Sequence, residues 1–326
     1  MDLKQLRTFI RVAETGSLSK ASDRLRLAQP ALSRQIALLE AEIGRRLFVR
    51  HGRGMQLTEA GQQLLERVTG LVHQLEKSVE EVRSLSDAPA GRVALGMTPT
   101  VSAVLAGRVA IRVAAELPGV SLRIVEGYGG HLVDWLHRGE VDVALLYGPA
   151  SDLHLRVTEL LFEELVLVGP REAALDGGGR FPVARLGELQ LVLPSRTHGL
   201  RAVVEAACDR VRTSLRVRFE ADSYRVLTEL VEAGLGYTIL PRSAVPQGEQ
   251  GGRFSVAGLG DPAVVRQVVL GLPSSRTDTS ATTAVTALVL DTIAGLVAAG
   301  AWQAHPAPPL AALLAAGRGA GGSPPG

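Results

Sequence analysis

The chain has 326 residues, of which 46% are apolar and 21% are charged, and its formal net charge is +2. This length suffices for two or three domains with real hydrophobic cores, and the composition excludes a fibrous protein and a chain that is disordered throughout. The single cysteine, Cys208, excludes an internal disulfide framework and fits a reducing compartment.

The first predicted elements are three short helices, of which the second and third are joined by a tight turn. The second helix is expected to begin after Ser17, a good N-cap, and the third at Pro30, which suits the first helical position. In the third helix Leu32, Ile36 and Leu39 recur at steps of four and three residues, so they predict one apolar stripe that faces inward.

The outer face of the third helix has the chemistry of a surface that reads DNA. Gln29 can pair with adenine, Ser33 can donate or accept a hydrogen bond, and Arg34 can reach guanine or phosphate. The predicted DNA-binding residues of this helical pair are Ser17, Gln29, Pro30, Ser33 and Arg34.

A two-stranded wing is predicted after the third helix. Apolar side chains flank a basic turn at residues 51–54, where glycine permits a sharp bend. Arg50 and Arg53, with Arg45 and Arg46, are expected near the phosphate backbone, where they supply affinity more than sequence choice.

Charge is unevenly distributed along the chain. Residues 1–58, which we call the head, carry a formal charge of +6, whereas the remainder carries −4. A basic segment of this kind is typical of nucleic-acid-binding proteins. The alternative, a structural helical hairpin with solvated arginines, leaves this asymmetry unexplained. We therefore predict an all-α winged helix-turn-helix DNA-binding domain over residues 1–58.

Residues 59–87 are predicted to form a long linker helix. Leu64, Val68, Leu71 and Leu75 follow helical spacing and leave the charged residues on other faces. Such a helix can pack along its own head or pair with a second copy of the chain, and its length favours dimerisation. Two heads on one dimer predict a DNA target that is an imperfect inverted repeat.

Residues 88–300, which we call the body, alternate predicted strands and helices in two sets. This pattern predicts an α/β fold with parallel strands and crossover helices. Helix starts after strands, such as that at Thr98, are places where free backbone N–H groups bind polar or anionic groups. Residues 301–326 are rich in alanine, glycine and proline and are predicted to be a disordered tail.

Catalytic and metal motifs are not found in the sequence. The seven histidines lack metal-ligand spacing, Ser195 does not lie in G-x-S-x-G, and the glycine clusters fit no nucleotide-binding loop. We expect no enzymatic activity, no metal and no cofactor.

Several ordered segments resemble LysR-type transcriptional regulators. The segments are AQPALSRQIALLEAEIGRRLFVRHGRGMQLTEAG in the head, and GRVALGM, ELPGVSLRIVEG, GEVDVALLYGP and EAGLGYTILP in the body. Within that family, LYGPAS and LVLPS look most similar to the nitrogen-assimilation-control branch.

The resemblance implies a body of two Rossmann-like lobes, as in periplasmic binding proteins, with the second lobe inserted into the first and an effector cleft between them. It implies linker helices that pair between subunits of a homodimer or homotetramer. The expected effector-binding residues are Thr98, Thr100, Gly129, Tyr147, Pro194 and Ser195. Tyr147 stands where some aromatic-acid sensors of the family carry arginine, which argues against an effector of that kind.

The function expected from these features is a transcriptional regulator that binds promoter inverted repeats as a dimer or tetramer. Its body would sense a small molecule or mediate oligomerisation, and RNA polymerase would be a further partner. We expect a cytoplasmic protein without membrane attachment. The alternative, a soluble small-molecule binding protein of the transport type, predicts an export signal that MDLKQLRTF does not resemble, and it leaves the basic head unexplained.

Overall fold

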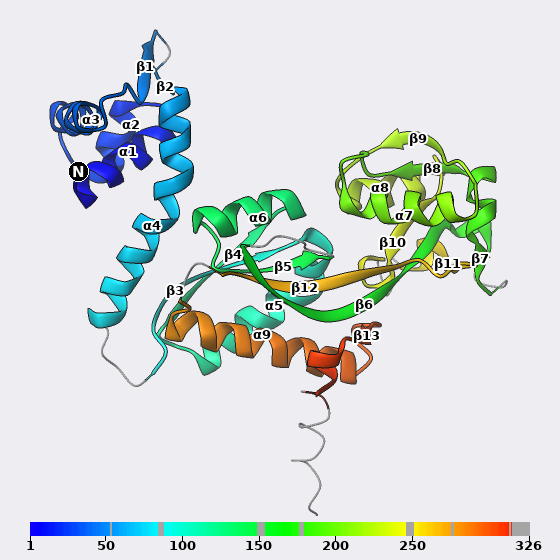
Figure 1. Cartoon of the computed structure of the whole chain (residues 1–326). Coiled ribbons are helices and arrows are strands. Elements are labelled where there is room, and N and C mark those ends of the chain that lie inside the picture. Colours follow the sequence, from blue (N-terminus) through cyan, green and yellow to red (C-terminus); the bar gives the residue numbers. More distant parts are fainter. Residues whose placement is uncertain are drawn as a thin grey trace, which may run out of the picture. The chain divides into compact units, whose positions relative to one another are not determined.

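A computed structural model describes residues 1–52, 54–83, 88–148, 154–175, 179–245, 251–274, 277–312 and 314. The chain divides into two compact units, one built mainly on residues 1–86 and the other on the body (Figure 1). Each unit is described by itself below.

The head begins with the three predicted helices, α1 (Leu3–Thr15), α2 (Leu18–Leu25) and α3 (Gln29–Ile43). Ser17 caps α2, because its side chain accepts a hydrogen bond from the Lys20 N–H at 3.4 Å. Leu32, Ile36 and Leu39 are buried, together with Phe9 of α1. The predicted inward stripe of α3 is therefore confirmed.

The predicted wing is present as the antiparallel strands β1 (Phe48–His51) and β2 (Gly54–Leu57). Its second strand is held against the turn between α1 and α2, since the Met55 N–H donates to the Gly16 carbonyl at 2.8 Å. Gly54 has φ +137°, and a Cβ there would collide with that carbonyl. Arg53 lies outside the described residues, as does the side chain of Arg50.

The linker helix α4 spans Glu59–Arg83, and residues 84–87 lie outside the described ranges. Its first half packs on the head through Leu64 and Val68. Farther along, Leu71, Leu75 and Val79 are 66%, 50% and 43% exposed. One helix therefore packs along its own head and also presents an uncovered apolar stripe.

The first lobe of the body is a sheet with helices on its faces. Strands β3, β4 and β5 are parallel, and α5 and α9 lie side by side and share one core with β3 and β5 (Figure 1). The bounds are β3 (Gly91–Met97), α5 (Pro99–Glu116), β4 (Val120–Glu126), α6 (Gly129–Arg138), β5 (Val143–Tyr147) and α9 (Ser280–Ala298).

Two long antiparallel strands, β6 (Leu155–Pro170) and β12 (Val265–Pro273), connect the first lobe to the second. Strand β12 pairs with β5 in the first lobe, whereas the end of β6 pairs with β10 and β11 in the second. The second lobe is thus inserted into the first between these two strands, as predicted.

The second lobe has its own core and contains parallel strands β8 and β9. Its strands are β7 (Phe181–Pro182), β8 (Gln190–Leu193), β9 (Arg216–Glu220), β10 (Thr238–Pro241) and β11 (Phe254–Gly260), and its helices are α7 (Gly199–Arg210) and α8 (Tyr224–Glu232). Short 3-10 turns cover Arg171–Ala173, Val183–Glu188, Arg242–Ala244 and Gly251–Arg253. Strand β11 had no counterpart in the sequence prediction.

The prediction of a disordered tail from residue 301 is wrong for its first part. Trp302 and Leu310 are at most 1% exposed and belong to the core of the first lobe. Between them β13 (His305–Pro306) pairs with β6. Large apolar side chains explain the difference, because they bury surface despite the surrounding alanine and proline. Residues 313 and 315–326 lie outside the described ranges.

Helix α9 is long and apolar enough to cross a membrane when judged by length and composition alone. Half of its most apolar window is buried inside the body. Val285, Val289 and Ile293 are fully buried in the core of the first lobe, so packing within the body accounts for this composition.

Candidate functional site

The surface predicted to read DNA is available in the structure. Gln29, Pro30 and Arg34 of α3 are exposed and Ser33 is half-buried, outside the buried stripe of the helix. Ser17 serves as the helix cap described above. The exposed side chains offer hydrogen-bond donors and acceptors beside the wing, which is the chemistry of a major-groove reader.

A buried carboxylate that the sequence analysis did not single out joins the reading helix to the wing. Glu40 of α3 is 9% exposed, and its Oε1 accepts hydrogen bonds from the backbone N–H groups of Leu47 at 2.8 Å and Phe48 at 3.2 Å. Its Oε2 accepts from Arg46 Nη1 at 3.2 Å. Glu40 therefore fixes where β1 starts relative to α3.

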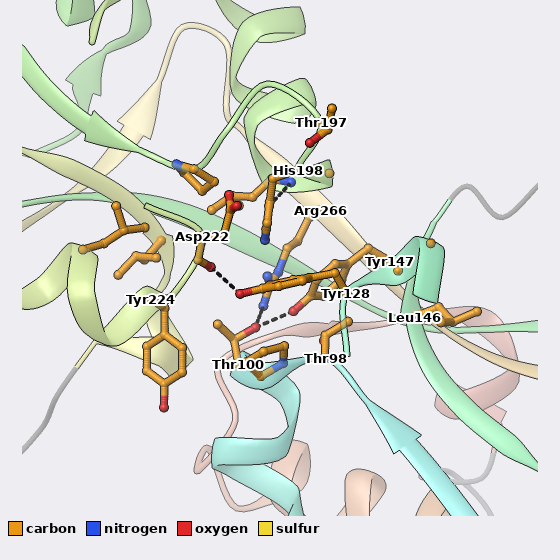
Figure 2. Close-up of a pocket in the computed structure, with 18 of the residues that line it drawn as sticks. Thr98, Thr100, Tyr128, Leu146, Tyr147, Thr197, His198, Asp222, Tyr224 and Arg266 are labelled. Atoms are coloured by element: carbon orange, nitrogen blue, oxygen red, sulfur yellow. Dashed lines mark hydrogen bonds between the residues drawn. The ribbon is translucent and has the colours of Figure 1, made fainter. Parts of the chain in front are cut away.

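The body contains a cavity of about 570 Å³ lined by residues of both lobes (Figure 2). The amino-terminal ends of four helices meet there: α5 at Thr98–Thr100, α6 at Tyr128–Gly130, α7 at Thr197–Leu200, and α8 at Tyr224. Helix N-termini present unpaired N–H groups and partial positive charge, so this arrangement suits a ligand with oxygen acceptors.

Arg266 of β12 supplies the buried cation of the cavity. Its side chain is 3% exposed, and its Nη2 donates to Thr100 Oγ1 at 3.0 Å (Figure 2). The guanidinium lies over the ring of Tyr147 at 4.2 Å from the centroid, and the Thr100 and Tyr147 hydroxyls are hydrogen-bonded to each other. Position 147 is a tyrosine, but the cavity still contains an arginine, because Arg266 of β12 reaches it.

The charge of Arg266 is balanced by Glu163 of β6, which is 1% exposed. Glu163 Oε2 accepts from Arg266 Nε at 2.8 Å and from Nη2 at 2.5 Å. Desolvation by burial lowers the pKa of Arg266, but Glu163 and Tyr147 together raise it by more, so the pKa is raised overall and the guanidinium stays charged. The Arg266 guanidinium is thus a fixed hydrogen-bond donor in the cavity, and its positive charge is neutralised by Glu163.

The opposite wall of the cavity has three further polar groups. The His198 Nδ1 accepts from the Leu200 N–H at 3.1 Å, and burial lowers the pKa of His198. Tyr128 reaches across from the first lobe, where its hydroxyl donates to the Asp222 carbonyl at 2.9 Å (Figure 2). The Ser195 N–H bond to the Asp222 carboxylate lowers the pKa of Asp222.

Five of the six predicted effector-binding residues line the cavity: Thr98, Thr100, Gly129, Tyr147 and Pro194. Ser195 is not among the lining residues, although its N–H donates to the carboxylate of Asp222, which is. Thr98 is 1% exposed, and its Oγ1 is a buried hydroxyl without a hydrogen-bond partner in the part of the chain that the structure describes.

Four polar residues at the cavity were not predicted from the sequence: Arg266, Glu163, His198 and Asp222. Arg266 and Glu163 are 103 positions apart. One signal was available for Arg266, a charged residue inside an otherwise apolar segment, VVRQVVLGLP, while Glu163 directly precedes the apolar segment ELVLVGP. In the described ranges, no group of histidine, cysteine, aspartate or glutamate side chains could hold a metal ion.

Comparison with known families places both parts of the chain. Residues 86–294 match the LysR substrate binding domain, and residues 3–62 match the bacterial regulatory helix-turn-helix protein, lysR family. The chain belongs to the LysR family of transcriptional regulators. As a LysR-type regulator it combines a helix-turn-helix domain with an effector-binding domain of two lobes.

Individual relatives agree with this assignment. The HTH-type transcriptional regulator BbuR of Bordetella bronchiseptica is 30% identical over 94% of each chain. The nitrogen assimilation regulatory protein nac of Klebsiella aerogenes is 34% identical over 75% of this LysR-type chain and 79% of its own, which supports the predicted resemblance to that branch. A full-length OxyR variant from Pseudomonas aeruginosa shares the fold, with a TM-score of 0.72, 22% identity, and coverage of 90% of this chain and 97% of its own.

Proposed function

We propose that this LysR-type regulator binds promoter inverted repeats as a dimer or tetramer and that a small molecule in the body cavity alters its activity. The observation that carries the DNA part is the exposed polar face of α3 beside a wing, on a head with net charge +6. Basic charge supplies affinity and the α3 side chains supply sequence choice.

Arg34 is the residue on which we place direct base recognition, with Gln29 and Ser33 beside it. A guanidinium fork bonds guanine at two points, whereas a lysine ammonium retains the charge without the fork. Arg45 and Arg46 are exposed beside the wing and fit phosphate contacts. The roles of Arg50 and Arg53 remain predictions from the sequence.

Oligomerisation is supported by apolar surface that the single chain leaves uncovered. Leu71 and Leu75 of α4 are exposed, and in the body Ile111 of α5 is 72% exposed and Val226 of α8 is 40% exposed. Pairing of α4 between two subunits would bury the first set and give the two heads needed for an inverted repeat. The body set would supply a second interface for a tetramer.

Effector binding is supported by the cavity itself. Its volume of about 570 Å³ lies within the range of small-molecule sites, and apolar walls surround a few convergent polar groups. The unpartnered hydroxyl of Thr98 adds an acceptor and donor that a ligand can satisfy. The alternative, in which the body serves only for assembly, gives this hydroxyl no role.

Two other activities receive no support from the structure. A thiol-based switch needs an accessible thiolate, but Cys208 is 2% exposed, and burial raises its pKa to about 11. Catalysis needs a nucleophile with a positioned base. We infer that the protein has no enzymatic activity and acts only by binding DNA and a small molecule. Acting on chromosomal DNA places it in the cytoplasm, with RNA polymerase as the partner through which it acts.

The DNA part is tested by selecting genomic fragments with the full-length protein and footprinting the best site at fixed salt. We expect an inverted repeat with two or more protected half-sites. Arg34→Ala should weaken binding and relax base preference by about 1–3 kcal/mol at one position, whereas Arg34→Lys should relax the preference with less loss of affinity. Enrichment without any repeat would contradict dimeric recognition.

The effector part is tested by melting of the full-length protein with metabolite mixtures. Gly130 lines the cavity, and a Cβ there meets no atom within 4 Å, so Gly130→Phe adds a large side chain at the cavity wall without a clash at Cβ. Gly295 of α9 is exposed and equally unobstructed, so Gly295→Phe is the matched control. A ligand-induced melting shift that Gly130→Phe abolishes and Gly295→Phe retains supports the cavity. A shift that survives Gly130→Phe contradicts it.

A further inference from the structure

Glu163 is shared between the cavity and the carboxyl-terminal segment 302–312. Its Oε2 accepts both hydrogen bonds from Arg266, which lines the cavity. Its Oε1 accepts from Trp302 Nε1 at 2.7 Å and from Ser243 Oγ at 2.6 Å. One carboxylate therefore holds a side chain of the effector site with one oxygen and the carboxyl-terminal segment with the other.

The position of Glu163 in the fold makes this sharing consequential. Glu163 and Arg266 are directly opposite each other on β6 and β12, the two strands that connect the lobes. The neighbouring residue Phe162 pairs with His305 of β13, and the Ala307 N–H donates to the Leu160 carbonyl at 2.8 Å. The same short stretch of β6 thus holds both the cavity cation and the carboxyl-terminal segment.

The hydrogen-bond network of Glu163, Arg266 and Trp302 is saturated at the Glu163 carboxylate. Glu163, Arg266 and Trp302 are each at most 4% exposed, so the bonds of Glu163 are shielded from bulk water. Both carboxylate oxygens already accept two hydrogen bonds each. A buried charged network of this kind transmits a change in one bond to the others, because an unsatisfied member is costly in a low dielectric.

We propose that Glu163 couples occupancy of the cavity to the packing of segment 302–312. The inference rests on the proposed function, since the occupant is the effector. An oxygen acceptor in the cavity competes with Thr100 for the Arg266 guanidinium. As the guanidinium turns toward the ligand, the carboxylate of Glu163 follows, and its bond to Trp302 weakens. By linkage, loosening the segment changes the affinity for the ligand by the same factor.

Segment 302–312 is suited to be the responding element. It follows the family match, which ends at residue 294. Trp302, Ala307 and Leu310 bury it against the first lobe, but its strand β13 spans only two residues. An element held by few backbone bonds opens more readily than the sheet beneath it.

The test perturbs the cavity end and measures the segment in the full-length protein. Thr100→Val removes the hydroxyl that accepts from Arg266. Thr197→Val is the matched control, because Thr197 also lines the cavity, but its hydroxyl bonds only Ser195, at 3.3 Å, among the described residues. The first readout is amide hydrogen exchange of peptides within 302–311. The second is acrylamide quenching of Trp302 in a Trp135→Phe background, which leaves Trp302 as the only tryptophan.

We expect Thr100→Val to speed exchange of the segment at least about threefold and to raise quenching of Trp302, with Thr197→Val unchanged. Glu163→Gln should produce a larger change, and if it does not fold, the threonine pair still decides. The coupling is overturned if Thr100→Val leaves both readouts unchanged, or if both threonine variants alter them equally. No effector is used, so failure here does not bear on ligand binding. Failure of the ligand titration would remove the occupant but would leave the measured link between Thr100 and the segment standing.

Discussion

Replacement of Glu40 provides the sharpest test of how the head positions its wing. Glu40→Ala leaves the N–H groups of Leu47 and Phe48 without their acceptor, and both residues are buried, at 0% and 6% exposure. Each unsatisfied buried N–H costs about 1–3 kcal/mol, so the local loss for the two groups is about 2–6 kcal/mol. Glu40→Gln retains an acceptor oxygen and loses mainly the pair with Arg46, whose side chain is 83% exposed. That loss should stay below about 1 kcal/mol.

Amide hydrogen exchange of peptides across residues 45–58 measures the local loss directly. A cost of about 2 kcal/mol corresponds to exchange that is roughly 30-fold faster. Glu40→Ala should also weaken binding to all DNA sequences, because the arginines near the wing lose their register, while Glu40→Gln stays close to the unmodified protein. Equal exchange rates in the two variants would refute the assignment of Glu40 as the brace between helix and wing.

Three further predictions concern the linker helix, the wing and the cavity. Leu71→Asp should yield monomers in light scattering, because it places a charge in the exposed apolar stripe of α4; an intact dimer would overturn this. Gly54→Ala should weaken DNA binding in a gel-shift titration, since its Cβ collides with Gly16, and Gly52→Ala, which meets no atom within 4 Å, should not. Burial lowers the pKa of His198, so the unfolded chain binds this proton more readily and stability should fall as the pH drops below about 6.5. His198→Asn, which can still cap α7, should flatten that pH dependence in thermal melts, and an unchanged slope would contradict it.

The head could be predicted from the sequence because its determinants are local. The buried spacing of Leu32, Ile36 and Leu39 lies within three helical turns, and the cap at Ser17 and the glycine turn of the wing are also short-range signals. Contacts between neighbours in sequence follow from periodicity alone. The predicted starts of the second and third helices accordingly agree with α2 and α3 to within one residue.

The centre of the cavity could not be predicted in the same way. Arg266 and Glu163 meet because β6 and β12 pair in one register, and no local pattern specifies a register between strands so far apart. The carboxyl-terminal segment was misjudged for a related reason. Its composition matches a tail, and only the tertiary partner of Trp302 shows that it is part of the core.

The second lobe begins and ends at a single point of the first. The Leu165 N–H donates to the Val264 carbonyl at 2.8 Å, so the entry and exit of a stretch of about a hundred residues are neighbours in one ladder. Such a stretch can be exchanged as a unit. Another lobe whose entry and exit strands have the same spacing can take its place without altering the first lobe, the linker or the head. Replacing the second lobe would change about half of the residues that line the cavity. The DNA sequence that the head recognises would stay the same. Evolution, or an engineer, can therefore change what the protein senses separately from which genes it reads.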